Sequence, residues 1–279
     1  MKSLGSALLL ALLLVAAAPA QESPPHDMSA SVVRVVATTP TGGTVFGSAV
    51  VIEPGKLITN CHVLRDAQEI YVARGAQKWR AARRAGDGRK DLCVLAVPGL
   101  DAPAATMVST ATLKVGEPAY AVGYAAGGSL APSQGRIESL YDFEGARVIR
   151  TSASFDVGAS GGALFTASGL LAGILTFKAP SGGSFHFAIP VDWLPAVEAA
   201  GQFGPPTDRG PAFFERDPGH WAHFLRAVWY ESTQQWSTLV AVCEHWASNE
   251  PGSEEARLTM TRAVDRLRHW SPGMPRRAP

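Results

Sequence analysis

Short apolar runs follow one another along the chain from Val32 to about Pro190. They are rich in Val, Ile, Ala and aromatic residues and are separated by Gly, Pro and Asp, as in SVVRVVATT, LCVLAV and LLAGILTF. Many short strands with frequent turn signals, and no long helical period, are typical of antiparallel sandwiches and barrels. The strands fall into two clusters on either side of residues 98–118, which we expect to connect two barrels.

The pattern becomes helical after the strands. VDWLPAVEAAG predicts one short helix that Gly201 ends. Residues 201–219 are rich in Pro and Gly and predict a linker, and residues 220–272 then contain three helical segments. The helical spacing is clearest at Trp236, Leu239, Val240, Cys243 and Trp246. We therefore expect a mainly β protein followed by a small α-helical C-terminal region.

The first 20 residues have the pattern of a signal peptide. Lys2 precedes an apolar run of Leu and Ala that ends in the small residues Ala18-Pro19-Ala20. The run is short and rich in Ala for a membrane span, although a signal anchor is the alternative. We expect cleavage near Ala20, a periplasmic or secreted mature protein and no stable membrane anchor after cleavage. Disulfides persist in such an oxidising compartment.

Charge and metal-ligand spacing exclude other classes of function. The formal net charge is +1, so the chain has no electrostatic footprint for a nucleic-acid partner. Residues 74–90 are locally basic, which favours a solvated loop or an edge strand. The chain has no C-x-x-C pair, and its His residues do not cluster at ligand spacing. We therefore expect neither a metal site nor a cofactor.

Three fragments carry candidate chemistry: ITNCHVL, KDLCVLAV and FDVGASGGALF. A serine hydroxyl such as that of Ser160 is a poor nucleophile and needs a base within hydrogen-bond reach. His62 titrates near neutrality and can take that proton, while a buried Asp91 would hold the imidazole in the required tautomer. Glycines around Ser160 let two backbone N–H groups converge on the oxyanion that forms in the transition state.

At these fragments the chain resembles the trypsin-like serine proteases of the chymotrypsin fold, and most closely their bacterial HtrA/DegP-type branch. GSAVVIEPGKLITNCHVL, DLCVLAV, GASGGALF and SFHFAIPVDWL resemble successive segments of that branch. The resemblance implies two six-stranded barrels within residues 21–200. It places the base at His62, the orienting acid at Asp91, the nucleophile at Ser160 and the oxyanion donors at Gly158 and Ser160.

The resemblance also indicates where the substrate pocket lies. Ala159 replaces the Asp or Asn that related enzymes carry before the nucleophile, which argues against activation by N-terminal cleavage. Ser154 stands where an Asp would bind Lys or Arg, so we expect a preference for small or medium aliphatic residues before the cleaved bond. Asp156 is expected to face solvent. The expected pocket residues are Ser154, Phe155, Thr176, Phe177 and Ile189.

The cysteines gain a meaning within this fold. Cys93 lies two residues after Asp91 on a strand, so both face the same side. The resemblance brings the Asp91 carboxylate to the backbone around His62, next to Cys61, and this predicts a Cys61–Cys93 disulfide. The alternative is two small buried thiols. Cys243 is then left as an odd thiol on a predicted helix.

The sequence leaves more than one interpretation open for the helical tail and for the function. Residues 220–272 lack the strand alternation of a PDZ domain and resemble about one tetratricopeptide repeat, or equally a helical hairpin packed on the protease. The leading function is a secreted or periplasmic serine endopeptidase that acts on polypeptides, unfolded proteins among them. The alternative is a catalytically silent protease-fold protein that binds a protein partner through its tail. Hydrolysis of small esters is a third reading.

Overall fold

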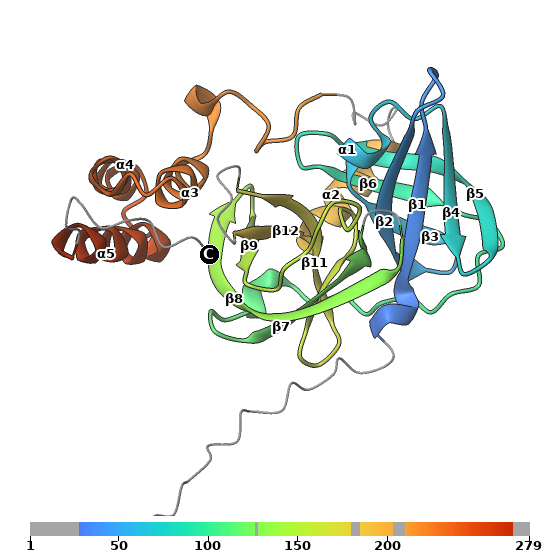
Figure 1. Ribbon diagram of the computed structural model, residues 1–279, viewed down its shortest axis with the longest axis horizontal. Coiled ribbons are helices and arrows are strands. Elements are labelled where there is room, and N and C mark those ends of the chain that lie inside the picture. The colour runs from blue at the N-terminus through green and yellow to red at the C-terminus, as the bar shows by residue number, and fades with distance from the viewer. Residues whose placement is uncertain (1–27, 126–127, 180–184, 203–209, 270–279) are drawn as a thin grey trace, which may run out of the picture.

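The structure is a computed structural model that describes residues 28–125, 128–179, 185–202 and 210–269. In this part of the chain, twelve strands close into two six-stranded antiparallel barrels that lie side by side (Figure 1). The strand order is β1-β2-β3-β6-β5-β4 in the first barrel and β10-β11-β12-β9-β8-β7 in the second. This confirms the predicted two-barrel fold. The predicted signal peptide, residues 1–20, lies outside the described residues.

The elements have the following bounds. The first barrel contains β1 (Val32–Thr38), β2 (Thr44–Glu53), β3 (Lys56–Thr59), β4 (Glu69–Arg74), β5 (Gln77–Asp87) and β6 (Leu92–Ala96). The second contains β7 (Pro118–Tyr124), β8 (Leu130–Phe143), β9 (Ala146–Thr151), β10 (Ala163–Thr166), β11 (Leu171–Lys178) and β12 (His186–Pro190). The α-helices are α1 (Cys61–Leu64), α2 (Leu194–Gln202), α3 (His223–Ser232), α4 (Trp236–Asn249) and α5 (Glu254–Arg268). Short 3-10 helices are η1 (Met28–Ser31), η2 (Thr110–Thr112), η4 (Val191–Trp193) and η5 (Pro218–His220).

The alternation of side chains along each strand builds separate cores. On β1, Val33 and Val35 pack in a hydrophobic cluster whose members all lie in the first barrel, in α1 or in the segments that adjoin them. Val32 points to the opposite face, as a strand requires, and joins a larger cluster that links both barrels, α2 and the tail. Residues 97–117 connect β6 to β7, which confirms the predicted crossover between the barrels.

Gly201 does not end its helix, contrary to the sequence prediction. α2 includes Gly201 and continues to Gln202. A Cβ at Gly201 would lie 2.5 Å from the Cβ of Ala85 on β5, so the missing side chain lets α2 pack closely on the first barrel. Gly201 therefore serves this packing contact rather than a helix stop.

The three tail helices pack against the second barrel instead of forming a separate body. In Figure 1 they lie as a layer beside β8 and β9. Phe224 of α3 stacks on Tyr141 of β8 with ring centroids 4.8 Å apart. The half-buried Glu231 accepts from Arg150 of β9 at 2.8 Å, and tail and barrel share one hydrophobic cluster. The three predicted helices are present, whereas the likeness to a tetratricopeptide repeat stays a prediction. No helix in the described ranges is long and apolar enough to cross a membrane.

The described end of the predicted linker, residues 210–217, is anchored to both barrels. Phe213 is buried, and its N–H donates to the Arg89 carbonyl at 2.8 Å. Phe214 stacks on a phenylalanine of β11, and Glu215 forms an ion pair with Arg65, just after α1. In Figure 1 this segment runs from beside α1 to α3. The segment is therefore part of the folded surface near α1, not a free tether.

Candidate active site

The turn after β3 and the residue before β6 meet at one point. His62 is the second residue of α1, and Asp91 directly precedes β6 with φ 58°. This left-handed conformation is uncommon outside glycine, and Asp and Asn tolerate it better than most residues. The Asp91 carbonyl accepts hydrogen bonds from the Cys61 N–H at 3.3 Å and the Asn60 side-chain amide at 3.0 Å. These contacts hold the strained residue against the His62 turn.

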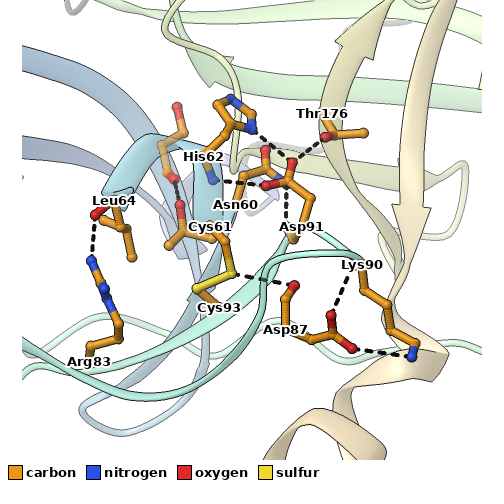
Figure 2. Close-up of a disulfide and its surroundings, with 12 residues drawn as sticks. Asn60, Cys61, His62, Leu64, Arg83, Asp87, Lys90, Asp91, Cys93 and Thr176 are labelled. Carbon is orange, nitrogen blue, oxygen red and sulfur yellow. Dashed lines mark hydrogen bonds and ion pairs between the residues drawn. A yellow bond between two sulfur atoms is a disulfide. The ribbon is translucent and has the colours of Figure 1, made fainter. Parts of the chain in front are cut away.

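The Asp91 carboxylate is wholly buried and receives three hydrogen bonds (Figure 2). The His62 N–H donates to Oδ1 at 2.9 Å, and the His62 ring contacts Oδ2 through Nδ1 at 2.7 Å. The Thr176 hydroxyl of β11 also donates to Oδ2, at 2.7 Å. Since a carboxylate accepts, Nδ1 carries the ring proton in neutral His62 and Nε2 keeps a free lone pair. The arrangement satisfies a buried charge and orients the imidazole.

The electrostatic surroundings favour the protonated form of His62. Burial of the ring lowers its pKa, but the charge of Asp91 and its hydrogen bond outweigh burial, so the pKa of His62 is raised above its ordinary value of 6.5. Glu215 raises this pKa further, and Arg65 opposes it. The anchored segment 210–217 therefore acts electrostatically on the histidine.

A disulfide joins the two segments that carry His62 and Asp91. Thr59 pairs with Cys93 in the β3–β6 register, so Cys61, two residues further on, lies beside Cys93. The two Cα atoms are 5.0 Å apart and the sulfur atoms are bonded (Figure 2). The predicted Cys61–Cys93 disulfide is thus present.

The glycine-rich turn before Ser160 is a type II β-turn. The Ala159 N–H donates to the Asp156 carbonyl at 3.0 Å, and Gly158 has φ 94°. A type II turn requires a positive φ at its third residue, which explains the glycine. The N–H groups of Gly158 and Ser160 donate to no acceptor within the described ranges. The turn thus leaves both donors available to a bound group.

Ser48 of β2 fastens this turn to the first barrel, a role that the sequence analysis missed. Its N–H donates to the Ser160 carbonyl at 2.8 Å, and its hydroxyl donates to the Gly158 carbonyl at 3.0 Å. A Cβ at Gly161 would lie 2.0 Å from the Ser48 carbonyl oxygen, so only glycine fits there. The small residues Gly47 and Ser48 were the available signal, because they allow two barrels to approach closely.

Ser160 reaches the histidine–aspartate pair through Thr176. The Ser160 hydroxyl donates to the Thr176 carbonyl at 3.4 Å, and no hydrogen bond among the described residues joins it to the His62 ring. The Thr176 hydroxyl in turn holds the Asp91 carboxylate. His62 and Asp91 are therefore in direct contact, and Ser160 belongs to the same hydrogen-bonded group.

The first two expected pocket residues lie on the loop before the type II turn. Ser154 is exposed, and its hydroxyl is 3.2 Å from the hydroxyl of Ser133. Phe155 is buried, and its ring centroid is 4.9 Å from that of His186. An apolar ring at this position agrees with the expected preference for an uncharged residue, which stays a prediction.

The other three expected pocket residues lie on β11 and β12. Thr176 is buried and donates to the Asp91 carboxylate, and Ile189 is wholly buried opposite Ile174 on β11. Phe177 packs its ring on Phe214 of the anchored segment. Neighbouring strand residues face opposite sides, so these three side chains need not share one wall, and their place in the substrate pocket stays a prediction.

An ion pair joins the type II turn to the end of β11. Lys178 Nζ lies 2.7 Å from Asp156 Oδ1, and the Asp156 side chain is 82% exposed. The hydrogen bond and charge of Lys178 lower the pKa of Asp156. This confirms the expectation that Asp156 faces solvent.

The remaining cysteine is a buried thiol. Cys243 is buried and unpaired on α4, and burial raises the pKa of its thiol to about 11. Within the described ranges, no group of His, Cys, Asp and Glu is arranged to hold a metal ion.

Known proteins share sequence and fold with the region that contains this site. The profile of the trypsin-like peptidase domain matches residues 47–174, a span that contains the His62, Asp91 and Ser160 segments. Residues 47–174 are therefore similar to a trypsin-like peptidase domain, and the relatives of this region are HtrA-type and DegP-like proteases. The protease domain is similar to the probable periplasmic serine endoprotease DegP-like of Pseudomonas savastanoi pv. phaseolicola, with 35% identity over 155 residues. This match covers 52% of the chain but only 32% of that relative. The corresponding Hahella chejuensis protein is 33% identical over 153 residues, covering 51% of the chain and 32% of the relative.

Solved structures agree with the fold. The HtrA-type protease AlgW, determined with a tripeptide, has a TM-score of 0.57 and 30% identity and covers 62% of this chain and 60% of its own. The serine endoprotease from Yersinia pestis has a TM-score of 0.56 and 28% identity, with 62% and 63% covered. The chain spans about a third of the length of the curated relatives it matches, so the likeness concerns the protease domain.

Proposed function

We propose that this chain is a serine endopeptidase in which His62 is the base, Asp91 the orienting acid and Ser160 the nucleophile. The observation that carries the proposal is the 2.7 Å contact between the His62 ring and the buried Asp91 carboxylate, next to a serine on a glycine-rich turn. Serine, histidine and buried aspartate in this relation are the groups that acyl transfer to water requires. The similarity to serine endoproteases supports the same chemistry.

The reaction proceeds by covalent catalysis. Rotation of the Ser160 side chain moves its hydroxyl from the Thr176 carbonyl towards His62 Nε2. As Ser160 Oγ bonds to the carbonyl carbon of the peptide, Nε2 takes the hydroxyl proton and Asp91 stabilises the imidazolium. The C–N bond then breaks, and the proton passes to the leaving amine. Water, deprotonated by the same His62, hydrolyses the acyl-enzyme and restores Ser160.

The oxyanion of each tetrahedral intermediate is bound by the backbone. Gly158 and Ser160 supply two N–H groups that have no other acceptor among the described residues. Ser48 holds the carbonyls of the same two residues, which preorganises the donors before the substrate arrives. Such donors contribute about 3–4 kcal/mol each to transition-state stabilisation.

The substrate is a polypeptide, with unfolded proteins as the simplest source of extended chain. The register between β10 and β11 ends at Ile174, and Leu175 still exchanges backbone hydrogen bonds with Gly161 and Gly162. Beyond Leu175, no strand from the described part of the protein pairs with this edge of β11. An extended peptide can add to such an edge through its backbone. Ser154 offers no negative charge, and we propose small or medium aliphatic residues before the cleaved bond.

The proposed compartment is the periplasm. Relatives of the protease domain are named periplasmic endoproteases, and the Cys61–Cys93 disulfide suits an oxidising environment. Residues 1–20 would direct export and be removed near Ala20. A protein partner for residues 220–272 remains a prediction of the sequence.

Casein cleavage tests the proposal. The wild-type protein is expected to degrade unfolded casein, and Ser160→Ala, which keeps the turn and its size, is expected not to. Equal degradation by both proteins would show that another residue or a contaminant cuts. Intact casein with both proteins would favour the alternative of a silent protease fold that binds partners.

A further inference from the structure

An apolar cavity lies where the tail meets the end of β11. Its volume is about 200 Å³, and we term it the tail pocket. Its lining residues are Phe177, Lys178, Ala179, Phe214, Trp221, Leu225, Val228 and Trp229. Three come from the protease strand and the turn after it, and the rest come from the anchored segment and from the tail.

Stacked aromatic rings build rigid walls for the tail pocket. The Phe177 ring lies between Phe187, at 4.5 Å, and Phe214, at 4.2 Å, and is nearly parallel to both. In the wall that the tail provides, the rings of Trp221 and Trp229 are 5.7 Å apart. The contacts of α3 with β8 and β9 hold this wall against the barrel, so the pocket is preformed.

The tail pocket lies further along the strand that carries Thr176. Phe177 directly follows Thr176, whose carbonyl accepts from Ser160 and whose hydroxyl holds Asp91. At about 3.3 Å per strand residue, Ala179 lies roughly 10 Å along β11 from Thr176. The edge of β11 that leads from Thr176 towards the pocket is the edge that no described strand pairs with beyond Leu175.

We propose that the tail pocket binds a large apolar side chain of the substrate, a few residues before the cleaved bond. This inference rests on the proposed endopeptidase function. A peptide that pairs antiparallel with β11, as every neighbouring strand of this barrel does, runs from Lys178 towards Thr176. The residues next to the pocket therefore precede the bond at Ser160. From the strand spacing, they stand roughly two to four positions before it.

The size and polarity of the tail pocket fit one side chain. Pockets for drug-sized ligands span about 300–1,000 Å³, so about 200 Å³ suits a smaller group such as Leu or Phe. The charged lining residue Lys178 is paired with Asp156. The remaining walls are aromatic or aliphatic and would leave an acidic side chain desolvated. The tail thereby acts as part of the substrate-binding surface.

Peptide binding to the full-length Ser160→Ala variant tests this inference without turnover. Fluorescein-labelled peptides carry Leu, Phe, Ala or Asp in turn at each of the four positions before an otherwise constant cleavage site, and anisotropy gives Kd. Leu or Phe at one of these positions is expected to bind at least about tenfold more tightly than Ala or Asp. Adding Trp221→Ala is expected to reduce this ratio to below about threefold, because it removes one wall.

Matched variants separate a lost pocket from a damaged fold. Trp236→Ala removes another half-buried tryptophan of the tail that lies outside the tail pocket, and it should keep the tenfold ratio. Phe214→Ala opens the pocket from the anchored segment, outside the tail helices, and should reduce the ratio like Trp221→Ala. The inference is wrong if the Ser160→Ala protein shows no tenfold preference for Leu or Phe, or if this preference survives in both Trp221→Ala and Phe214→Ala.

Fluorophosphonate labelling distinguishes the two proposals. The wild-type protein and Trp236→Ala, both with Ser160 intact, should label at the same rate, because Trp236 lies outside the tail pocket. If the probe labels Ser160 but Trp221→Ala leaves the ratio of peptide Kd values unchanged, the protease proposal stands and the pocket proposal is wrong. If the probe does not label Ser160 but Trp221→Ala reduces the ratio of peptide Kd values, the pocket proposal stands and the catalytic proposal is wrong.

Discussion

Replacing both Cys61 and Cys93 by alanine removes the covalent tie between the His62 turn and the strand that follows Asp91. The disulfide spans a sequence separation of 32 residues. In the chain-entropy model, a loop of this length lowers the entropy of the unfolded chain by about 12 cal/mol/K, which is about 3.7 kcal/mol at 25 °C. Each kcal/mol shifts Tm by about 2–4 °C for a domain of this size, so we expect a fall of about 7–15 °C.

Thermal melts with and without a reductant measure this effect. The wild-type protein is expected to lose most of this Tm difference when it is reduced, whereas the double variant should not change. Cys243→Ala is the control, because Cys243 is buried on α4 and unpaired. It should remain sensitive to the reductant. A reductant-induced shift below about 2 °C in the wild type, or all three cysteines of the chain titrating as thiols after denaturation without reductant, would refute the reasoning.

Three further changes probe the proposed catalytic group. Thr176→Val removes one of the hydrogen bonds to the buried Asp91 carboxylate and should lower kcat about 10–100-fold with little change in KM, measured on a peptide substrate. His62 must be neutral to act as a base and its pKa is raised, so the acid limb of the kcat/KM profile against pH should lie above pH 6.5. Because Glu215 raises the pKa of His62, Glu215→Gln should move this limb to lower pH. A limb that does not move would show that Glu215 has no effect on His62. Gly158→Ala strains a residue at φ 94° and should lower the rate of probe labelling about 100-fold; labelling at the wild-type rate would contradict the role of the turn.

Local patterns along the chain predicted much of the fold. The strand clusters, the crossover at residues 98–118 and the helices after residue 220 follow from periodicity and turn residues. β5 was less apparent, because basic residues of Gln77–Asp87 suggested a loop or an edge strand. In the structure β5 pairs with both β4 and β6, so the charged residues belong to a strand with neighbours on both sides, neither a loop nor an edge strand.

Contacts between distant segments were harder to predict. Residues 210–217 contain Pro and Gly and were interpreted as a linker, since their partners on β11 and after α1 are far away in the sequence. Ser48 was missed for the same reason: its role consists of hydrogen bonds to the Gly158 and Ser160 carbonyls of the other barrel. Thr176 was expected in the substrate pocket from its position in the fold, whereas its hydrogen bond to Asp91 on the other barrel has no local sequence signal.

The three catalytic candidates were identified because their chemistry and order along the chain are distinctive. Sequence reasoning could name His62, Asp91 and Ser160, but it could not show how the strained Asp91 backbone is held. That depends on hydrogen bonds from Asn60 and Cys61, which form only once β3 and β6 pair. The disulfide between the same segments adds to this support.

The central claim is that Ser160 is a nucleophile activated by His62. Intact-mass analysis after incubation with a fluorophosphonate, followed by peptide mapping, tests it most directly. We predict a single adduct on Ser160 in the wild-type protein, with no adduct in Ser160→Ala and very slow labelling in His62→Ala. An unmodified wild-type protein, or an adduct at another residue that persists in Ser160→Ala, would contradict the claim.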